Sequence, residues 1–399
     1  MPRRAAPILI PLAFIAFVSL GLPDCVLGVA WPSIRATFHQ PLSQLGPILI
    51  GGAAGYLLSG FFAGQIVRTI GVGRLLLASA LTVVLSLIAY AIAPLFPIIV
   101  LAAVIGGLGA GAIDAGINTF AASHFSPRIV NWLHASWGIG ATTGPLLMTA
   151  VLATHHGWRL AYVILAVAMS LLSLLFLATQ RLWEDDAPAP AHLHPDHPTA
   201  SLSQALRHPT VWMQSLLFFV YGGIESTAGQ LLYTLFTEQR GINPTTAGVT
   251  VGGYWGALTV GRIIFGQLAA SVSRRTILRT GMILALIAAI LISWNPTPII
   301  SLGGMALLGF ALAPIFPTLI SATPATVGPR YAPHAVGFQV AAASLGIAAF
   351  PAIVSLLARA CGLEVVCTYL VAAATLLIVL HELTTRLAET APPLQVQRA

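Results

Sequence analysis

Charged residues are scarce in this chain of 399 residues. Only 7% of the residues are charged, whereas a typical soluble domain has about a quarter. The 18 basic residues are all arginine, because lysine is absent. With 57% hydrophobic residues, the polar side chains could not cover a water-soluble globule of this size. We therefore do not expect a soluble enzyme, a nucleic-acid-binding protein or a disordered chain, and the apolar surface calls for a lipid bilayer as its partner.

Patterns for metals, disulfides and covalent catalysis are also missing. The three cysteines show no disulfide framework, and no Walker loop, zinc motif or nucleophile elbow occurs. Several histidines lie close together, but the Pro- and Ala-rich sequence around them indicates a loop rather than a metal site. They are His192, His194, His197 and His208. We expect no metal, no cofactor beyond a coupling ion and no enzymatic activity.

Twelve apolar runs are long enough to cross a bilayer, which takes about 20 residues each. The run that follows Met1 is longer than a signal sequence and lacks a good cleavage site, so we interpret it as an uncleaved first span. The only long connection, 181–208, is polar. The sequence thus predicts an all-α integral membrane protein with an N-terminal half (1–180), a cytoplasmic linker (181–208) and a C-terminal half (209–399). The predicted spans are 8–33, 44–67, 73–92, 96–123, 131–154, 159–180, 210–236, 245–270, 276–294, 299–322, 333–358 and 364–383.

Arginine gives the orientation of these spans. If the N-terminus is cytoplasmic, thirteen arginines fall on the inner side and four on the outer side. The four outer ones are Arg35, Arg159, Arg240 and Arg359. The positive-inside rule therefore predicts a multi-pass protein of the cell (inner) membrane with both termini in the cytoplasm.

The two halves repeat each other weakly. Gly64-Gln65, at the end of the second span, recurs as Gly266-Gln267 at the end of the eighth. Pro127-Arg128 after the fourth span recurs as Pro329-Arg330 after the tenth. Duplicated six-span halves are the layout of transporters that rock about a site near the membrane midplane.

Over nearly its whole length the chain resembles the major facilitator superfamily. The span count and the central linker carry most of the resemblance. In the loop after the second span, Gly64, Gly71 and Arg74 match the superfamily's signature, whereas Arg68 stands where an acid is usual. The resemblance implies a major facilitator fold of two pseudo-symmetric six-helix halves.

Two acids lie inside spans of the N-terminal half, where an ionisable group is costly and usually faces a cavity or a partner. Asp24 follows Pro23, which weakens the local helix, and Asp114 is four residues before Asn118, on the same helix face. A carboxylate held out of water binds a proton more readily. We interpret Asp114 and Asp24 as proton-coupling residues, and Asp24 and Asn118 as substrate ligands. In the alternative interpretation, Asp24 is satisfied by backbone groups and Asp114 bonds Asn118 as packing.

Polar and aromatic side chains in later spans are further candidates for binding substrate. We interpret Arg262 as a gating or structural charge that pairs with Glu225; alternatively, Arg262 extends to the inner surface. For His134 the alternative is an interfacial histidine beside a tryptophan of the aromatic belt. The candidate substrate-binding residues of these spans are His134, Trp137, Glu225, Gln230, Tyr254, Trp255 and Gln339.

Within the superfamily, the pattern is similar to the fucose permease-like sugar:proton symporters. That group has an acid in the first span and another in the fourth, followed four residues later by asparagine. Asp24, Asp114 and Asn118 match this pattern, with Asp114 where fucose permease has glutamate. The Leu-His-x3-Gly-x-Gly run that contains His134 also resembles this group. The resemblance implies a monomeric transporter that imports a sugar or glycoside with protons by alternating access.

A competing motif lies in the fifth span. Gly140-x3-Gly144-Pro145 is part of the motif of drug:proton antiporters, although Leu147 and Met148 replace the paired glycines that should follow. A proton-coupled exporter of drugs or metabolites is therefore the second hypothesis, and a membrane sensor that binds a solute without moving it is the third. The sequence does not decide between proton and sodium as the coupling ion.

Overall fold

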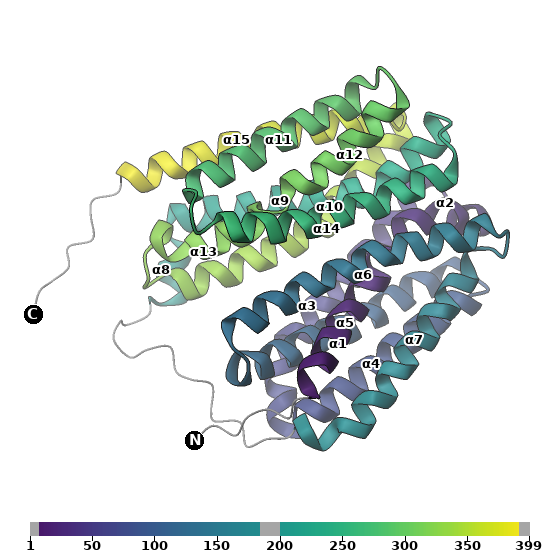
Figure 1. Cartoon of the computed structure of the whole chain (residues 1–399), viewed down its shortest axis with the longest axis horizontal. Helices are drawn as coiled ribbons and strands as arrows, with labels where there is room; N and C mark the ends of the chain where they lie inside the picture. Colours follow the sequence, from purple (N-terminus) through teal and green to yellow (C-terminus); the bar gives the residue numbers. More distant parts are fainter. Residues whose placement is uncertain (1–7, 184–199, 391–399) are drawn as a thin grey trace, which may run out of the picture.

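The computed structural model describes residues 8–183 and 200–390, and every regular element in these ranges is helical (Figure 1). Histidines 192, 194 and 197 of the linker lie outside the described residues. The first half comprises α1 (Leu9–Asp24), α2 (Leu27–Thr37), η1 (Leu42–Gln44), α3 (Leu45–Ile70), α4 (Val72–Ile92), α5 (Phe96–His124), α6 (Pro127–Ala153), α7 (Trp158–Thr179) and η2 (Gln180–Trp183). After the short α8 (Leu202–Leu206), the second half comprises α9 (Pro209–Thr234), η3 (Leu235–Gln239), α10 (Pro244–Leu268), α11 (Arg274–Trp294), α12 (Pro298–Leu312), α13 (Ile315–Val327), α14 (Ala332–Cys361) and α15 (Val365–Thr390).

These helices form the twelve predicted spans. Eight spans are long and apolar enough to cross a membrane, and the bent pair α1–α2 forms a ninth. The remaining three are α6, α9 and α10, which carry most of the candidate site residues and are more polar for that reason. Nearly all helix ends lie within four residues of the predicted span ends; the tenth and twelfth spans run further than predicted.

Two spans are broken next to proline, and for the first of them the sequence indicated a weakened helix. The helix axis bends by 41° between α1 and α2, just after Pro23. The tenth span is interrupted between α12 and α13, at Pro314. Proline has no backbone N–H to donate, so it leaves a carbonyl of the preceding turn without its helical partner. In the first span, the break places Asp24 at the end of a helix rather than within one.

Glycines hold α1 tightly against α6. A β-carbon added at Gly21 would overlap with backbone atoms of Trp137, and one added at Gly140 would overlap with the carbonyl oxygen of Val18. Gly144 contacts the backbone of Leu22 in the same way. Small residues allow such close approach of helices in membranes. In this chain, the glycines of the antiporter-like motif thus pack two helices of one half together.

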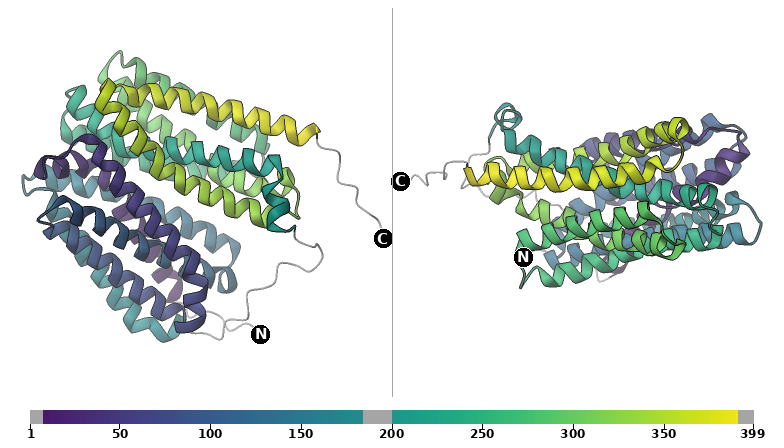
Figure 2. Two further views of the ribbon diagram at one scale, coloured as in Figure 1. Left: turned by 180° about the vertical axis from the view of Figure 1, so that it is seen from behind. Right: turned by 90° about the horizontal axis from the view of Figure 1, so that it is seen from above.

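The two six-helix halves converge at one end of the molecule and diverge at the other (Figures 1 and 2). We call the end where α1 begins and α15 ends the linker end, because the segments before and after the linker also lie there. The opposite end is the far end. In Figure 1 the linker end is on the left and the far end on the right.

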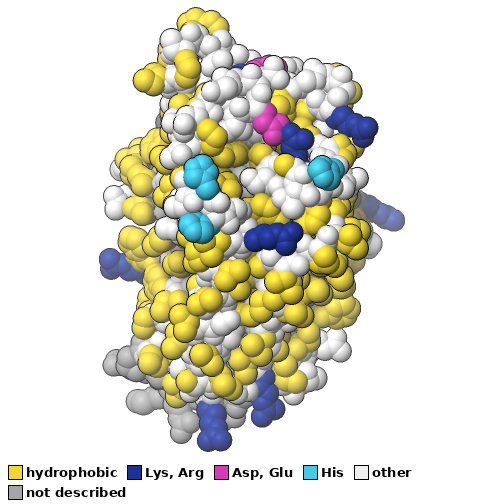
Figure 3. All heavy atoms as spheres, turned by 90° about the vertical axis from the view of Figure 1, so that its right-hand side faces the viewer, with side chains coloured by type: hydrophobic (Ala, Val, Ile, Leu, Met, Phe, Trp, Pro, Cys, Tyr) yellow, Lys and Arg dark blue, Asp and Glu magenta, His cyan; other side chains and the backbone are white. Residues whose placement is uncertain are grey.

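The halves contact each other toward the far end. The backbone of Gly28 in α2 meets that of Gly229 in α9, and Gly46 in α3 lies against Ala352 in α14. Arg35 forms an ion pair with Glu238 across the same junction. The far end is covered by packed side chains in the space-filling view (Figure 3). These contacts close the molecule on this side.

Toward the linker end the halves are apart. At Gly60 and Gly64 of α3 and at Gly266 of α10, an added β-carbon would have no neighbour within 4 Å. Phe61, between the two glycines of α3, is 83% exposed. Helices that pack across the junction at the far end are therefore free of each other at the linker end.

Arg240 ties four elements of the second half together at the far end. Its guanidinium donates two hydrogen bonds to the carboxylate of Glu364, at 2.8 and 2.7 Å. It also bonds the carbonyl oxygen of Ile292 at 2.9 Å and the hydroxyl of Ser301 at 2.6 Å. The Arg240 side chain is only 6% exposed. A buried guanidinium with all these partners joins the end of η3 to α11, α12 and α15.

Replacing Arg240 with alanine should destabilise the second half by about 2–4 kcal/mol, because several buried polar groups lose their partner. Glu364→Gln should reduce the stability of the second half by less, since that carboxylate is half exposed. The bonds from Arg240 hold the pKa of Glu364 below its ordinary value. The contribution of Glu364 is therefore complete above about pH 4.3, the ordinary value for glutamate, and is lost as the pH falls through the lower folded value.

Thermal unfolding of the detergent-solubilised protein between pH 3 and pH 7 checks this. The gap in unfolding temperature between wild type and Glu364→Gln should be largest at neutral pH and should shrink below pH 4. Arg359→Gln, near the same end of α14, serves as the control for a change of charge alone. A gap that does not change with pH would contradict the role assigned to the pair.

Candidate transport site

Asp114 is the centre of a hydrogen-bonded group between α3 and α5. The hydroxyl of Tyr56 donates to its Oδ2 at 2.7 Å, and the amide of Asn118 donates to its Oδ1 at 3.0 Å. Asp114 and Asn118 are both partly exposed. The bond between them is the one that the packing interpretation required. However, both side chains remain accessible, so the bond does not remove them from a candidate binding site.

Asp24 lies at the end of α1, where the span breaks, and is exposed. It lies close enough to the side chain of Trp137 and to Asp114 to interact with both. Two carboxylates from different helices thus face the same region of the first half. An exposed carboxylate next to a helix break needs water or a ligand rather than hydrocarbon around it.

Glu225 occupies the corresponding place in the second half. It is 8% exposed and accepts a hydrogen bond from the hydroxyl of Tyr221, one turn earlier in α9. A guanidinium nitrogen of Arg262, in α10, lies 3.9 Å from Oε2 of Glu225. This is the pairing that the sequence suggested. Tyr254 donates to the backbone carbonyl of Glu225 at 3.0 Å and is fully buried, so it holds α9 in place instead of facing an open site.

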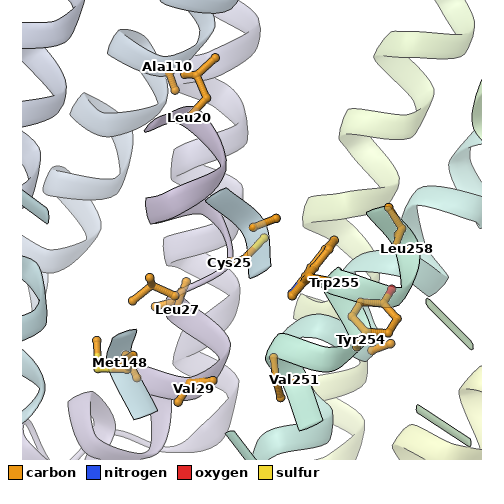
Figure 4. Close-up of a cluster of buried hydrophobic side chains, with 14 of the residues drawn as sticks. Leu20, Cys25, Leu27, Val29, Ala110, Met148, Val251, Tyr254, Trp255 and Leu258 are labelled. Carbon is orange, nitrogen blue, oxygen red and sulfur yellow. The ribbon is translucent and has the colours of Figure 1, made fainter. Parts of the chain in front are cut away.

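An aromatic contact joins the two groups across the junction of the halves. The rings of Trp137 in α6 and Trp255 in α10 meet edge to face, with centroids 5.8 Å apart. The guanidinium of Arg262 lies over the ring of Trp137, 5.6 Å from its centroid. Figure 4 shows the ring of Trp255 directed toward Cys25, at the break between α1 and α2. Arg262 therefore contacts residues of both halves.

Two further predicted residues, His134 and Gln230, differ in their exposure. His134 is exposed, packs edge to face on Phe17 and lies within electrostatic range of Asp114 and Arg262. Gln230 is buried next to the tight contact of α9 with α2, and its Oε1 has no hydrogen-bond partner among the described residues.

Gln339 does not lie with the central residues. It is fully buried within the second half. Its oxygen accepts from Thr323 at 3.0 Å and its amide donates to Gln214 at 3.2 Å. The structure therefore places it in a network that joins α9, α13 and α14, although the sequence suggested a substrate contact.

Two features were missed at the sequence level. Tyr56 sits in an apolar run, and nothing near it in the chain signals its bond to Asp114, 58 residues later. The ion pair of Arg35 and Glu238 joins residues 203 positions apart in the two halves. Only the internal repeat, by placing both residues at outer span ends, hinted that they could meet.

The charge balance of this region limits its chemistry. Among the described residues, it holds three carboxylates, Asp24, Asp114 and Glu225, but one guanidinium, Arg262. When all four groups are ionised, their net charge is −2, from three negative charges and one positive charge. Such an excess is unfavourable at membrane depth unless cations or protons reduce it. The described residues contain no group of three or more side chains suited to hold a metal ion.

Comparison with known proteins agrees with the fold. The chain is 22% identical over 342 residues to the glucose/mannose transporter GlcP of Bacillus subtilis, covering 83% of each chain. It is 24% identical over 388 residues to human sodium-dependent glucose transporter 1, covering 86% of this chain and 72% of that one. The crystal structure of FucP in its outward conformation superposes with a TM-score of 0.64 at 15% identity, covering 96% and 99% of the two chains.

The family assignment rests on nearly the whole sequence. The profile of the Major Facilitator Superfamily matches residues 9–237 and 215–398. The twelve helical spans in two halves agree with it. The chain belongs to the Major Facilitator Superfamily, whose members are membrane transporters and not enzymes.

Proposed function

We propose that the protein imports a sugar or glycoside together with protons by alternating access. The observation that carries the proposal is the excess of two negative charges at the junction of the halves. A proton bound by Asp114 or Asp24 lowers this excess and makes it less costly to enclose the site. The names of the two glucose-transporting relatives support a sugar as the substrate.

The proposal assigns a role to each central group. Asp24, Asn118 and Glu225 hydrogen-bond hydroxyl groups of the substrate, and the ring of Trp137 stacks on the apolar face of a sugar. Trp137 is partly exposed, whereas Trp255 is 5% exposed and supports it edge to face. Because Arg262 lies over the ring of Trp137, a stacking sugar displaces it toward Glu225. Substrate binding thereby changes a contact between the halves.

The proposal also assigns a direction to the two ends. The excess of thirteen arginines against four supports a cytoplasmic position for the linker end. The far end, where the halves meet, then faces outward, and the arrangement described above is an inward-facing state. Alternating access requires the contacts of Gly28 and Arg35 to open while the linker end closes. A ligand biases these two states only by its difference in affinity for them.

Uptake into proteoliposomes tests the proposal. A thermal-shift screen over sugars, glycosides and cationic drugs first selects a substrate, since a ligand that binds the folded protein stabilises it. With acid outside, the radiolabelled substrate should accumulate above its equilibrium level, and a protonophore should abolish this accumulation. Accumulation that follows only a sodium gradient would identify sodium as the coupling ion. Proton-driven extrusion of a cationic drug, with no sugar uptake, would favour the exporter.

A further inference from the structure

A small pocket lies inside the second half, away from the junction of the halves. Its volume is about 240 Å³, and it is lined by residues of α9, α11, α13 and α15 near the linker end. Its lining includes Ala325, an exposed residue in the last turn of α13. A single water needs about 15 Å³, and drug-sized pockets begin at about 300 Å³. The pocket therefore suits a compact ligand.

One buried side chain of the pocket has no partner. His381 of α15 is 7% exposed, and its Nε2 atom makes no hydrogen bond to any described residue. A buried polar atom without a partner costs about 1–3 kcal/mol. An atom of this kind that lines a pocket points to a ligand or ordered water there.

The remaining polar groups indicate the chemistry of such a ligand. Thr326, Thr384 and Thr385 each donate their hydroxyl hydrogen to a carbonyl one turn earlier, so toward the pocket they offer oxygen acceptors. Gln214 uses its oxygen to accept from Gln339 at 3.2 Å, which leaves its amide as a donor. The pocket thus presents three acceptors, one donor and one imidazole nitrogen.

This set of groups selects among ligand classes. An oxyanion needs several donors, and the pocket is rich in acceptors instead. A cation finds no free carboxylate here, because Glu382, the acid next to His381, is already ion-paired with Arg279 at 2.6 Å. A neutral polyol matches, since each hydroxyl can both donate to a threonine oxygen and accept from an amide.

We propose that this pocket is a second binding site, which takes a small neutral polyol such as a monosaccharide. It is separate from the central residues but joined to them by α9. Gln214 and Glu225 are eleven residues apart on this helix, close to three full turns, and so lie on the same face. A ligand that forms a hydrogen bond with Gln214 is therefore connected to Gln339 and Thr323, whose hydrogen bonds link α9 to α13 and α14. The site is argued from its own groups and does not depend on the proposed function.

Stabilisation by D-glucose and by glycerol tests the second site on the purified full-length protein. Ala325→Trp adds an indole ring to the pocket lining at an exposed position, and His381→Phe removes the unpartnered nitrogen. Ala372→Trp, at an exposed position of α15 outside the pocket lining, is the matched control. Trp137→Ala impairs the central site. Each independent site adds its own term to the stabilisation by ligand.

We expect the shift in unfolding temperature produced by D-glucose to fall in Ala325→Trp and His381→Phe, and to stay unchanged in Ala372→Trp. In Trp137→Ala, part of the shift should persist. Adding Ala325→Trp to that variant should abolish the remaining shift. Loss of the whole shift in Trp137→Ala would overturn the second site while supporting sugar binding at the centre. Loss of the shift in Ala325→Trp, with no loss of the shift in Trp137→Ala, would support the second site and refute a central sugar site. Equal shifts in Ala325→Trp and Ala372→Trp would also overturn it.

Discussion

Asp114→Asn should abolish accumulation of substrate against its gradient while leaving equilibration across the membrane measurable. Asparagine has nearly the same shape and can still accept from Tyr56, which bonds the carboxylate at 2.7 Å. It cannot, however, take up and release a proton. The halves can still rock, but the proton gradient no longer drives them.

The measurement compares two assays on the same proteoliposomes. Uptake driven by a pH gradient should fall by more than tenfold, which corresponds to about 1.4 kcal/mol of lost coupling. Exchange of labelled for unlabelled substrate without a gradient should remain within a few-fold of wild type. Asp114→Glu, which restores a carboxylate, should retain accumulation. Glu364→Gln, which removes an acid outside the central group, serves as a negative control.

Two outcomes would refute this role. If Asp114→Asn still accumulates substrate, the coupling proton binds elsewhere, and Asp24→Asn becomes the decisive variant. If both exchange and accumulation are lost while thermal stability is unchanged, Asp114 binds the substrate itself and is not required only for coupling.

Much of the fold could be predicted because the membrane makes strong demands on the sequence. A span must be about 20 apolar residues long, so the twelve helices and their ends follow from hydropathy. Pro23 also predicted the break in the first span, because the missing N–H acts locally. Intramembrane acids are rare, so Asp24, Asp114 and Glu225 stood out, and the structure places all three near the junction of the halves.

Contacts between distant helices could not be predicted in the same way. Gln339 looked like a polar handle for substrate, but its partners Thr323 and Gln214 come from two other helices. Tyr254 seemed available, but its hydroxyl is committed to the backbone of α9. Helix periodicity gives the face of a residue, whereas the neighbour on that face depends on packing. The conformational state depends on packing as well.

Gly28→Ala should hold the far end open and strongly reduce transport. A β-carbon at this position would overlap with the carbonyl oxygen of Gly229 and lie 2.9 Å from the Cα atom of Gln230. Both obstacles are backbone, so no side chain can turn aside. An extra methyl group in a packed contact costs about 1–3 kcal/mol, which shifts a two-state equilibrium by about 5- to 150-fold. In helices alanine is otherwise more favourable than glycine, so a loss of function would not come from a weaker α2.

Cys25 reports the state of the far end. It is 2% exposed here and lies three residues before Gly28, facing Trp255 (Figure 4). In a Cys361→Ser background, which removes the exposed cysteine, a polar thiol reagent should modify Gly28→Ala much faster than wild type. Gly303→Ala in α12, where a β-carbon meets no atom within 4 Å, should behave as wild type.

Removing charge at the same junction gives a graded comparison. Glu238→Gln breaks the ion pair with Arg35, but both side chains are partly exposed, so the loss is at most about 1 kcal/mol. Labelling of Cys25 should therefore rise in the order wild type, Glu238→Gln, Gly28→Ala, and transport should fall in the same order. If Gly28→Ala transports normally and Cys25 stays protected, the backbone contact does not limit closure. A different contact between the halves would then have to close the far end.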